Sequence, residues 1–288
     1  MKILIKNSGL LLLFFITFIS CDKKEDEIII EPNFNEISNI ATFYGNKNAE
    51  IIIVNTQGGP TTELANEDIK DIAKTSSLAQ KALFVNVHQA QTKTPSNFKK
   101  EITFEKAKEY DKESVKMLKK VIDYFKKQSN KKVYVLGISF GAFMTQELIA
   151  TYGISTADKY LIAVGRLNID KGTWVPFSQG KNTKYVFKND GTYSIEVFNA
   201  RNEEGRSMAK LAAGLGYNRY TEKLASIKDL SKVTYVYGGR DEAVGPLSKI
   251  ELDFLKQKKA TIVLDVKGNH FTASDKAIAM MKQYFDIN

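Results

Sequence analysis

The sequence predicts an α/β fold built around one mainly parallel β-sheet with helices on both faces. Short apolar runs alternate along the chain with longer segments whose apolar residues recur at helical spacing. The short runs are continuous and rich in Val and Ile, which is typical of strands that are covered on both faces. No linker interrupts the pattern, and 288 residues suit one large domain. We therefore predict a single domain at residues 35–288.

Each predicted element has a local signal. Residues 51–54 are an uninterrupted β-branched run, and residues 105–128 carry an apolar stripe at helical spacing that predicts a core face laid on the sheet. The predicted strands, in order, are 37–44, 51–54, 82–87, 133–136, 160–164, 233–237 and 261–266. The predicted helices are 66–81, 105–128, a segment that reaches about Tyr152, 246–257 and 273–285.

The alternation breaks at about residues 168–231, which we call the insertion. Asn189-Asp190-Gly191 separates the runs 185–187 and 193–197 and predicts a hairpin, because Asp-Gly tolerates the positive φ angles of a tight turn. Helical stretches follow, with Gly205, Gly214 and Gly216 expected to break them. The insertion is expected to be a lid over a site, or alternatively a packed edge subdomain without a role in substrate binding.

Residues 1–20 resemble a bacterial lipoprotein signal. Lys2 and Lys6 precede the apolar segment 10–19, which is too short to span a bilayer as a helix. Cys21 follows directly and is the only cysteine of the chain, so no disulfide can form within it. This arrangement resembles a lipobox, in which the thiol is lipidated and the chain is cut before it, although Phe18 stands where leucine is usual. An ordinary secretory signal with an incidental cysteine is the alternative.

Residues 21–34 are predicted to be a solvated tether, because the run 22–27 is entirely charged. Acidic runs beside lipidated cysteines resemble sorting signals of Gram-negative lipoproteins. We therefore expect the protein in the cell envelope, held by a lipid at Cys21 to a bacterial membrane, the outer membrane in particular.

Charge and composition exclude several classes of partner. The formal net charge is +9, but the lysines are spread over helix faces and are not interleaved with aromatics in a recognisable motif, so no nucleic-acid partner is predicted. One cysteine and two distant histidines do not match a zinc site, and no Gly-rich phosphate loop is followed by a lysine. We predict no metal and no cofactor. The sequence indicates no oligomeric state.

Chemistry is predicted at Gly137-Ile138-Ser139-Phe140-Gly141, which joins the strand 133–136 to the helix after it. A G-x-S-x-G sequence between a strand and a helix is typical of a nucleophile elbow, where a tight turn exposes the serine hydroxyl. Ser139 is thus the predicted nucleophile. A serine nucleophile needs a neighbouring base, which a third group must orient.

Suitable partners follow later in the chain, each just past a predicted strand. Asp241 comes after the strand 233–237 and His270 after the strand 261–266. Because the carboxyl ends of parallel strands meet at one edge of a sheet, we expect both side chains near Ser139. Glu242 and Asp170 are rival acids. A second histidine, His88, follows the strand 82–87 and is expected to be a structural or loop residue.

With these motifs in this order, residues 35–288 resemble the α/β-hydrolase superfamily. The resemblance implies a Ser139–His270–Asp241 triad and makes the strand 160–164 the sixth strand, after which a lid insertion is usual. It also implies an oxyanion hole formed by the backbone N–H of Phe140 and that of Gly58 or Gly59. The loop that carries these glycines resembles the family's His-Gly-Gly-Pro loop, with Gln57 in place of histidine; Pro60 has no N–H to donate.

The resemblance implies a serine hydrolase that forms an acyl-enzyme, and carboxylic esters are its most common substrates. Peptidases and thioesterases use the same constellation, so a small-molecule or peptide acyl substrate is expected. A catalytically inactive surface-binding lipoprotein on the same scaffold is the alternative from a different class.

Overall fold

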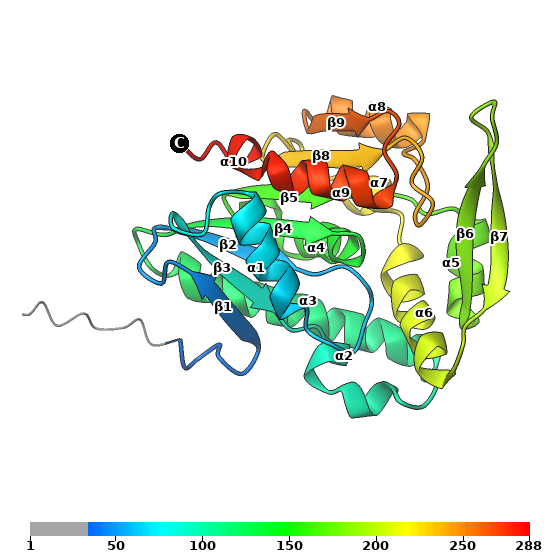
Figure 1. Ribbon diagram of the computed structural model, residues 1–288, viewed down its shortest axis with the longest axis horizontal. Coiled ribbons are helices and arrows are strands. Elements are labelled where there is room, and N and C mark those ends of the chain that lie inside the picture. Colours follow the sequence, from blue (N-terminus) through cyan, green and yellow to red (C-terminus); the bar gives the residue numbers. More distant parts are fainter. Residues whose placement is uncertain (1–33) are drawn as a thin grey trace, which may run out of the picture. The chain divides into compact units, whose positions relative to one another are not determined.

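The computed structural model describes residues 34–288, so the predicted signal, the lipidation at Cys21 and nearly all of the tether lie outside the described residues. The core of the fold is a seven-stranded sheet in the order β1-β3-β2-β4-β5-β8-β9 (Figure 1). Only β1 is antiparallel to its neighbour; the other strands are parallel. The strands of this sheet are β1 (Ala41–Gly45), β2 (Ile51–Thr56), β3 (Ala82–Val87), β4 (Lys132–Ile138), β5 (Lys159–Ala163), β8 (Val233–Gly238) and β9 (Thr261–Asp265).

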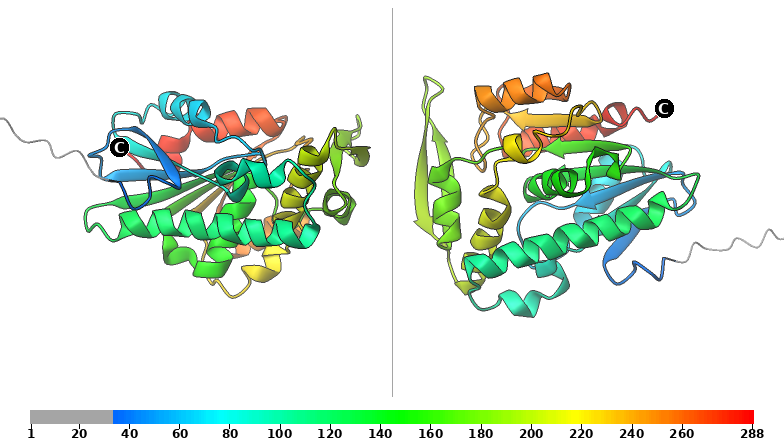
Figure 2. Two further views of the ribbon diagram at one scale, coloured as in Figure 1. Left: turned by 90° about the horizontal axis from the view of Figure 1, so that it is seen from below. Right: turned by 180° about the vertical axis from the view of Figure 1, so that it is seen from behind.

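Helices cover both faces of the sheet, as Figure 2 shows. One apolar core contains buried side chains of α3 and α4, and a second core on the opposite face contains those of α1, α9 and α10. The helices outside the insertion are α1 (Asn66–Thr75), α2 (Ala90–Lys93), α3 (Phe104–Lys126), α4 (Phe140–Tyr152), α8 (Lys249–Gln257), α9 (His270–Ala279) and α10 (Met281–Tyr284). Within residues 34–288, no helix has the length and apolar character needed to cross a bilayer.

The predicted boundaries differ from the observed ones where turns intervene. The first strand starts at Ala41 and not at Ile37, which lies in a turn with its side chain fully buried. The helix predicted at 66–81 ends at Thr75, because Ser77 takes a positive φ of 57° and Leu78 then folds back into the core. Serine is a weak helix former, since its hydroxyl competes for backbone hydrogen bonds.

Two helices near the C-terminus start at side-chain caps that the periodicity does not indicate. Ser248 and Glu251 form a capping box that sets the start of α8 at Lys249, and not at residue 246. Asn269 accepts hydrogen bonds from the backbone N–H groups of Phe271 and Thr272 and so starts α9 at His270. The cap thus fixes the backbone at the predicted catalytic histidine.

The insertion lies between β5 and β8 and has its own two-stranded sheet. It consists of α5 (Lys171–Ser178), β6 (Lys181–Phe187), β7 (Tyr193–Asn199), α6 (Glu203–Gly216) and α7 (Tyr220–Lys223). The predicted hairpin is observed, with Gly191 at a φ of 84° in its turn. Along the described chain β5 is the fifth strand, one fewer than the family numbering gave it.

The prediction that glycines break the helices of the insertion was wrong for Gly205 and Gly214, which lie inside α6. A Cβ at Gly214 would lie 2.0 Å from Oδ2 of Asp111 on α3. Gly214 therefore lets α6 approach α3 closely, and packing against α3 stabilises a helix that local propensity disfavours.

Candidate active site

Ser139 lies at the junction of β4 and α4 in a backbone conformation that L-residues rarely adopt, with φ 54° and ψ −114°. The two flanking glycines leave room for this junction. A Cβ at Gly141 would lie 1.9 Å from the carbonyl oxygen of Thr56, and one at Gly137 would lie 2.2 Å from Oγ1 of Thr145. No real side chain tolerates such distances, so the packing of α4 against β2 and β4 requires glycine at both positions.

The structure brings the three predicted residues together. Nε2 of His270 is 2.9 Å from Oγ of Ser139, and Nδ1 of the same ring is 2.9 Å and 2.8 Å from the two carboxylate oxygens of Asp241. With the proton on Nδ1, the ring donates to Asp241 and accepts the serine proton at Nε2. Loops that are 102 and 29 residues apart in sequence meet here because β4, β8 and β9 are parallel and end at one edge of the sheet.

Asp241 is 1% exposed and is held by the backbone of its own loop. Its Oδ1 accepts hydrogen bonds from the N–H groups of Ala243 at 2.9 Å and Val244 at 3.0 Å. The carboxylate of Glu242 accepts from the backbone N–H of His270, at 3.5 Å, and makes no hydrogen bond with the ring. Of the two neighbouring acids, Asp241 is therefore the one that orients the imidazole.

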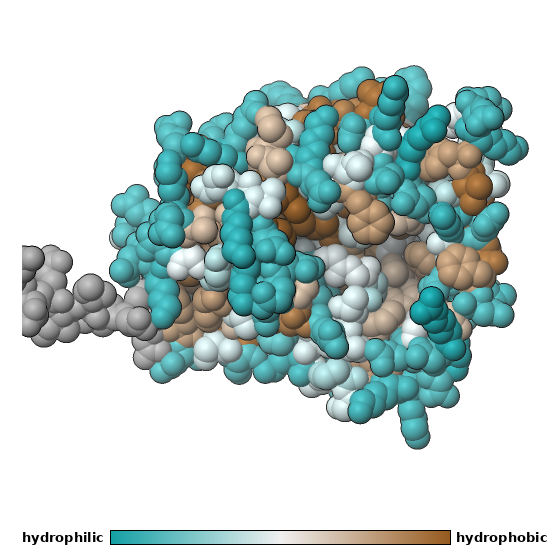
Figure 3. Space-filling model, in the orientation of Figure 1, coloured by the Kyte–Doolittle hydropathy of each residue, from teal (hydrophilic) through white to brown (hydrophobic). Residues whose placement is uncertain are grey.

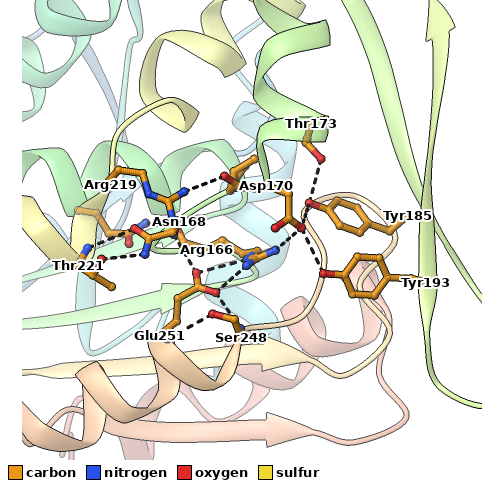
Figure 4. A network of polar contacts seen from close by, with 12 residues as sticks. Arg166, Asn168, Asp170, Thr173, Tyr185, Tyr193, Arg219, Thr221, Ser248 and Glu251 are labelled. Atoms are coloured by element: carbon orange, nitrogen blue, oxygen red, sulfur yellow. Dashed lines mark hydrogen bonds and ion pairs between the residues drawn. The ribbon is translucent and has the colours of Figure 1, made fainter.

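The remaining rival acid, Asp170, and the second histidine, His88, lie elsewhere. Asp170 accepts hydrogen bonds from Arg166 at 2.9 Å and from the hydroxyls of Tyr185 and Tyr193 at 3.0 and 3.3 Å (Figure 4). His88 makes a 3.0 Å hydrogen bond with Thr92, and burial, with a smaller effect of Lys93, lowers its pKa. Neither residue bonds to Ser139 or His270.

The residues predicted to supply the two oxyanion donors, Phe140 and Gly58 or Gly59, lie close to the serine. Phe140 opens α4, so its N–H has no acceptor within the helix. The backbone of Gly58 passes so close that a Cβ there would lie 3.4 Å from Cβ of Ser139. The N–H groups of Gly58 and Gly59 donate to no acceptor among residues 34–288. These groups are available to an oxyanion.

Gln57 is buried and fixes the loop that carries the two glycines; it stands where the His-Gly-Gly-Pro loop that this segment resembles has histidine. Its amide donates to the carbonyl oxygen of Glu63 at 2.9 Å and accepts from the N–H of Ala65 at 2.8 Å. The carbonyl oxygen of Gln57 accepts from the side chain of Gln89, also at 2.9 Å. Glutamine therefore fixes the loop through hydrogen bonds on both sides.

Two cavities meet at Ser139. The first, of about 310 Å³, lies under the insertion and is mostly apolar; we call it the insertion cavity. The second, of about 620 Å³, runs between α1 and α9 and includes His270 in its wall; we call it the α1–α9 groove. The apolar lining of the insertion cavity includes Phe140, Phe143, Ile169, Phe177, Phe198, Met208, Ala209, Ala212 and Val244.

A buried ionic network anchors the insertion, and the sequence analysis did not identify it. Arg166, which follows β5, bonds to Glu251 of α8 at 2.7 Å and to Asp170, the residue before α5 (Figure 4). Burial by itself lowers the pKa of Arg166, but its hydrogen bond to Glu251 and the nearby carboxylates raise it on balance. An arginine within the apolar segment 160–169 is the signal that could have indicated it.

Among the described residues, no three His, Cys, Asp or Glu side chains lie close enough together to hold a metal ion.

Comparison with known proteins identifies the fold. No protein-family model and no curated protein matches the chain. Solved structures do match. The lipase-esterase related protein from Clostridium acetobutylicum ATCC 824 aligns with a TM-score of 0.53 at 12% identity, covering 85% of this chain and 98% of that one. The chain has the α/β-hydrolase fold.

Two further structures agree with this assignment. MGS-M2, an alpha/beta hydrolase enzyme from a Medee basin deep-sea metagenome library, has a TM-score of 0.52 at 12% identity, over 86% of this chain and 94% of that one. A structure of the metagenome-derived lipolytic enzymes LipS and LipT gives 0.56 at 9% identity, over 87% and 98%. At identities this low, structural similarity establishes the fold alone, and the activity must be argued from the site.

Proposed function

We propose that the protein is a serine hydrolase that cleaves a carboxylic ester through an acyl-enzyme. The observation that carries this proposal is the continuous hydrogen-bonded line from Oγ of Ser139 through His270 to the buried carboxylate of Asp241. A serine hydroxyl gains nucleophilicity when an oriented base can take its proton. Lipolytic and lipase-esterase names among the structures of the same fold agree with an ester substrate.

In the first half of the reaction, Oγ of Ser139 attacks the ester carbonyl carbon while Nε2 of His270 takes the hydroxyl proton. The N–H groups of Phe140 and of Gly58 or Gly59 donate to the oxyanion that forms. The carbon–oxygen bond to the leaving alcohol then breaks, its electron pair stays on the leaving oxygen, and His270 returns the proton to that oxygen. Asp241 stabilises the imidazolium meanwhile.

In the second half, water takes the place of the alcohol. His270 removes a proton from the water, the hydroxide attacks the acyl carbon, and the proton returns to Oγ of Ser139 as the carboxylic acid departs. The apolar insertion cavity suits the acyl chain. Its volume of about 310 Å³ is at the lower end of the range for ligand pockets, which favours a short or medium chain.

We also propose that the mature chain is lipidated at Cys21 and anchored to the bacterial outer membrane. The support is the sequence alone: a basic start, a short apolar segment and a single cysteine directly after it. Anchoring would determine where the substrate is met, and not which bond is cleaved.

The test of the proposed activity is labelling of the purified protein with a fluorophosphonate, which reacts with activated serines. We expect labelling that is abolished by Ser139→Ala and retained by Ser226→Ala, a matched change at an exposed serine. Absence of labelling in the folded wild-type protein would favour a binding protein on a hydrolase scaffold instead. Hydrolysis of ester, thioester and aminoacyl-amide substrates then decides among the acyl bonds.

A further inference from the structure

The α1–α9 groove has a charge opposite to that of the chain as a whole. Its walls carry Asp68 and Asp71 on α1 and Asp275 on α9, and no lysine or arginine lines it. The chain has a net charge of +9, so a lining that contains three carboxylates and no lysine or arginine is a local exception. Figure 3 shows apolar side chains at the bottom of this region, between hydrophilic ones over α1 and α9.

These carboxylates are largely unpaired within the described part of the chain. Asp68 and Asp275 take part in no ion pair there, and Asp71 has only an exposed one with Lys74, at 3.7 Å. Asp68 and Asp71 are three residues apart on α1 and so point to the same side. A cation in the groove would meet negative charge from both helices.

A buried acceptor in the same groove also lacks a donor. Asn55 lines the groove from β2 and is 2% exposed. Its amide nitrogen donates to Asn86 at 2.8 Å, which fixes the side chain, while its Oδ1 has no hydrogen-bond partner. Burying an acceptor without a donor costs free energy, so this oxygen favours a ligand that carries an N–H or O–H group.

The groove also offers an aromatic face. Phe271, directly after the catalytic histidine, lines the groove and is 69% exposed. An ammonium group gains from an aromatic face nearby. The groove is therefore complementary to a protonated amine, because it combines carboxylates, an unpaired amide oxygen and an exposed phenyl ring.

The position of His270 decides which part of the substrate enters the groove. The imidazole must hand its proton to the leaving oxygen, so the leaving group has to lie on the side of Ser139 where His270 is. His270 lines the α1–α9 groove and not the insertion cavity. The groove therefore takes the alcohol, and the insertion cavity takes the acyl chain.

We propose that the substrate is an ester of an amino alcohol, whose protonated amine binds in the α1–α9 groove while an apolar acyl chain fills the insertion cavity. This inference rests on the proposed ester hydrolysis. Bond breaking follows the steps given above: the released alcohol takes its proton from His270, and the amine keeps its own.

The test compares two butyrate esters of the same shape, 2-(dimethylamino)ethyl butyrate and 3-methylbutyl butyrate, with the purified full chain. Only the first carries a positive charge at neutral pH. We expect kcat/KM to be about tenfold higher for the cationic ester at low ionic strength, since partly exposed charges contribute modestly. The ratio should fall in about 1 M salt, where the screening length is about 3 Å.

The double variant Asp71→Asn/Asp275→Asn removes one carboxylate from each wall and should bring the ratio close to one. Glu113→Gln, a matched change at an exposed position of α3 outside the groove, should keep it. Equal turnover of the two esters, or a ratio that the double variant does not change, overturns the inference.

Fluorophosphonate labelling of the same preparation separates this inference from the proposed activity. If Ser139 is labelled but neither butyrate is cleaved, protection decides: 2-(dimethylamino)ethanol must slow the labelling more than 3-methylbutanol does, and equal protection contradicts the proposal. If the folded protein is neither labelled nor active, the proposed function is wrong and this inference fails with it.

Discussion

At the scale of single residues, backbone hydrogen bonds decide which of two adjacent acids bonds to the imidazole of His270. Asp241 and Glu242 are adjacent in sequence, but only Asp241 reaches the imidazole, because the backbone N–H groups of Ala243 and Val244 hold its carboxylate. Glu242 contacts a backbone group instead. Two adjacent loop residues therefore differ in role: Asp241 orients the imidazole and Glu242 makes no hydrogen bond with it.

Replacing the orienting acid tests this difference. We expect Asp241→Asn to lower kcat by about 10³- to 10⁴-fold with little change in KM, because an amide favours the wrong tautomer of His270. Glu242→Gln is the matched control and should retain most of the activity. Ester hydrolysis measured on both variants checks the assignment, and a larger loss in Glu242→Gln would transfer the role to Glu242.

At the scale of elements, the contact between α3 and α6 buries a carboxylate. Asp111 is 2% exposed, both of its carboxylate oxygens lack a hydrogen-bond partner, and Gly214 of α6 lies directly against it. Burial, and to a smaller extent the charge of Glu147, raises the pKa of Asp111 well above its usual range. α6 also lines the insertion cavity, so this contact fixes one wall of the proposed acyl site.

The raised pKa has a consequence for stability. Below the pKa of Asp111 in the unfolded state, near 3.9, the carboxyl is protonated in both states. As the pH rises from there through the higher pKa of the folded state, the unfolded state loses its proton first, so the free energy of unfolding decreases. We expect Asp111→Asn to be more stable than wild type at pH 8, by about 1.4 kcal/mol for each unit by which the pKa is raised. The difference in the free energy of unfolding between Asp111→Asn and wild type should be smaller at pH 5.

Denaturant unfolding at the two pH values measures this effect, with Glu113→Gln as the control on the exposed face of the same helix. Parallel stability curves for wild type and Asp111→Asn across this range would show that Asp111 is not buried in the way described.

At the scale of the whole molecule, the insertion and the sheet form the two sides of one site. Segments that follow strands β4, β8 and β9 carry Ser139, Asp241 and His270, and the insertion supplies most of the apolar wall of one cavity. The network of Arg166, Asp170 and Glu251 joins the insertion to α8. A buried ion pair of this kind adds little net stability, but losing one partner is costly, so it favours a single placement of the insertion.

The proposed anchoring also concerns the whole molecule. In a Gram-negative host we expect the wild-type chain to incorporate labelled palmitate and to sediment with the outer membrane. Cys21→Ser should lose the label and leave the membrane fraction, because the lipid is the proposed attachment. Ser139→Ala should keep both properties, and membrane association that persists in Cys21→Ser without label would disprove a lipid anchor at Cys21.

The sequence by itself determined the elements whose signals are local. The strands 82–87 and 233–237 match the structure closely, since short, largely apolar runs of this kind are typical of strands covered on both faces. The G-x-S-x-G motif and the positions of Asp241 and His270 after strands were likewise sufficient to predict which three side chains meet. The constraint in each case is the steric requirement of a turn or the common edge of a parallel sheet.

Only the tertiary structure decided what depends on partners distant in sequence. It showed that Asp170 accepts hydrogen bonds from Arg166 and two tyrosines, and that Gly214 packs against α3 from inside a helix. It also showed that acids of α1 and α9 line one groove. Local pattern says which side of a helix is polar, but not which other helix that side will meet. Such pairings are set by the packing of the whole chain, because close approach and burial are properties of two surfaces together.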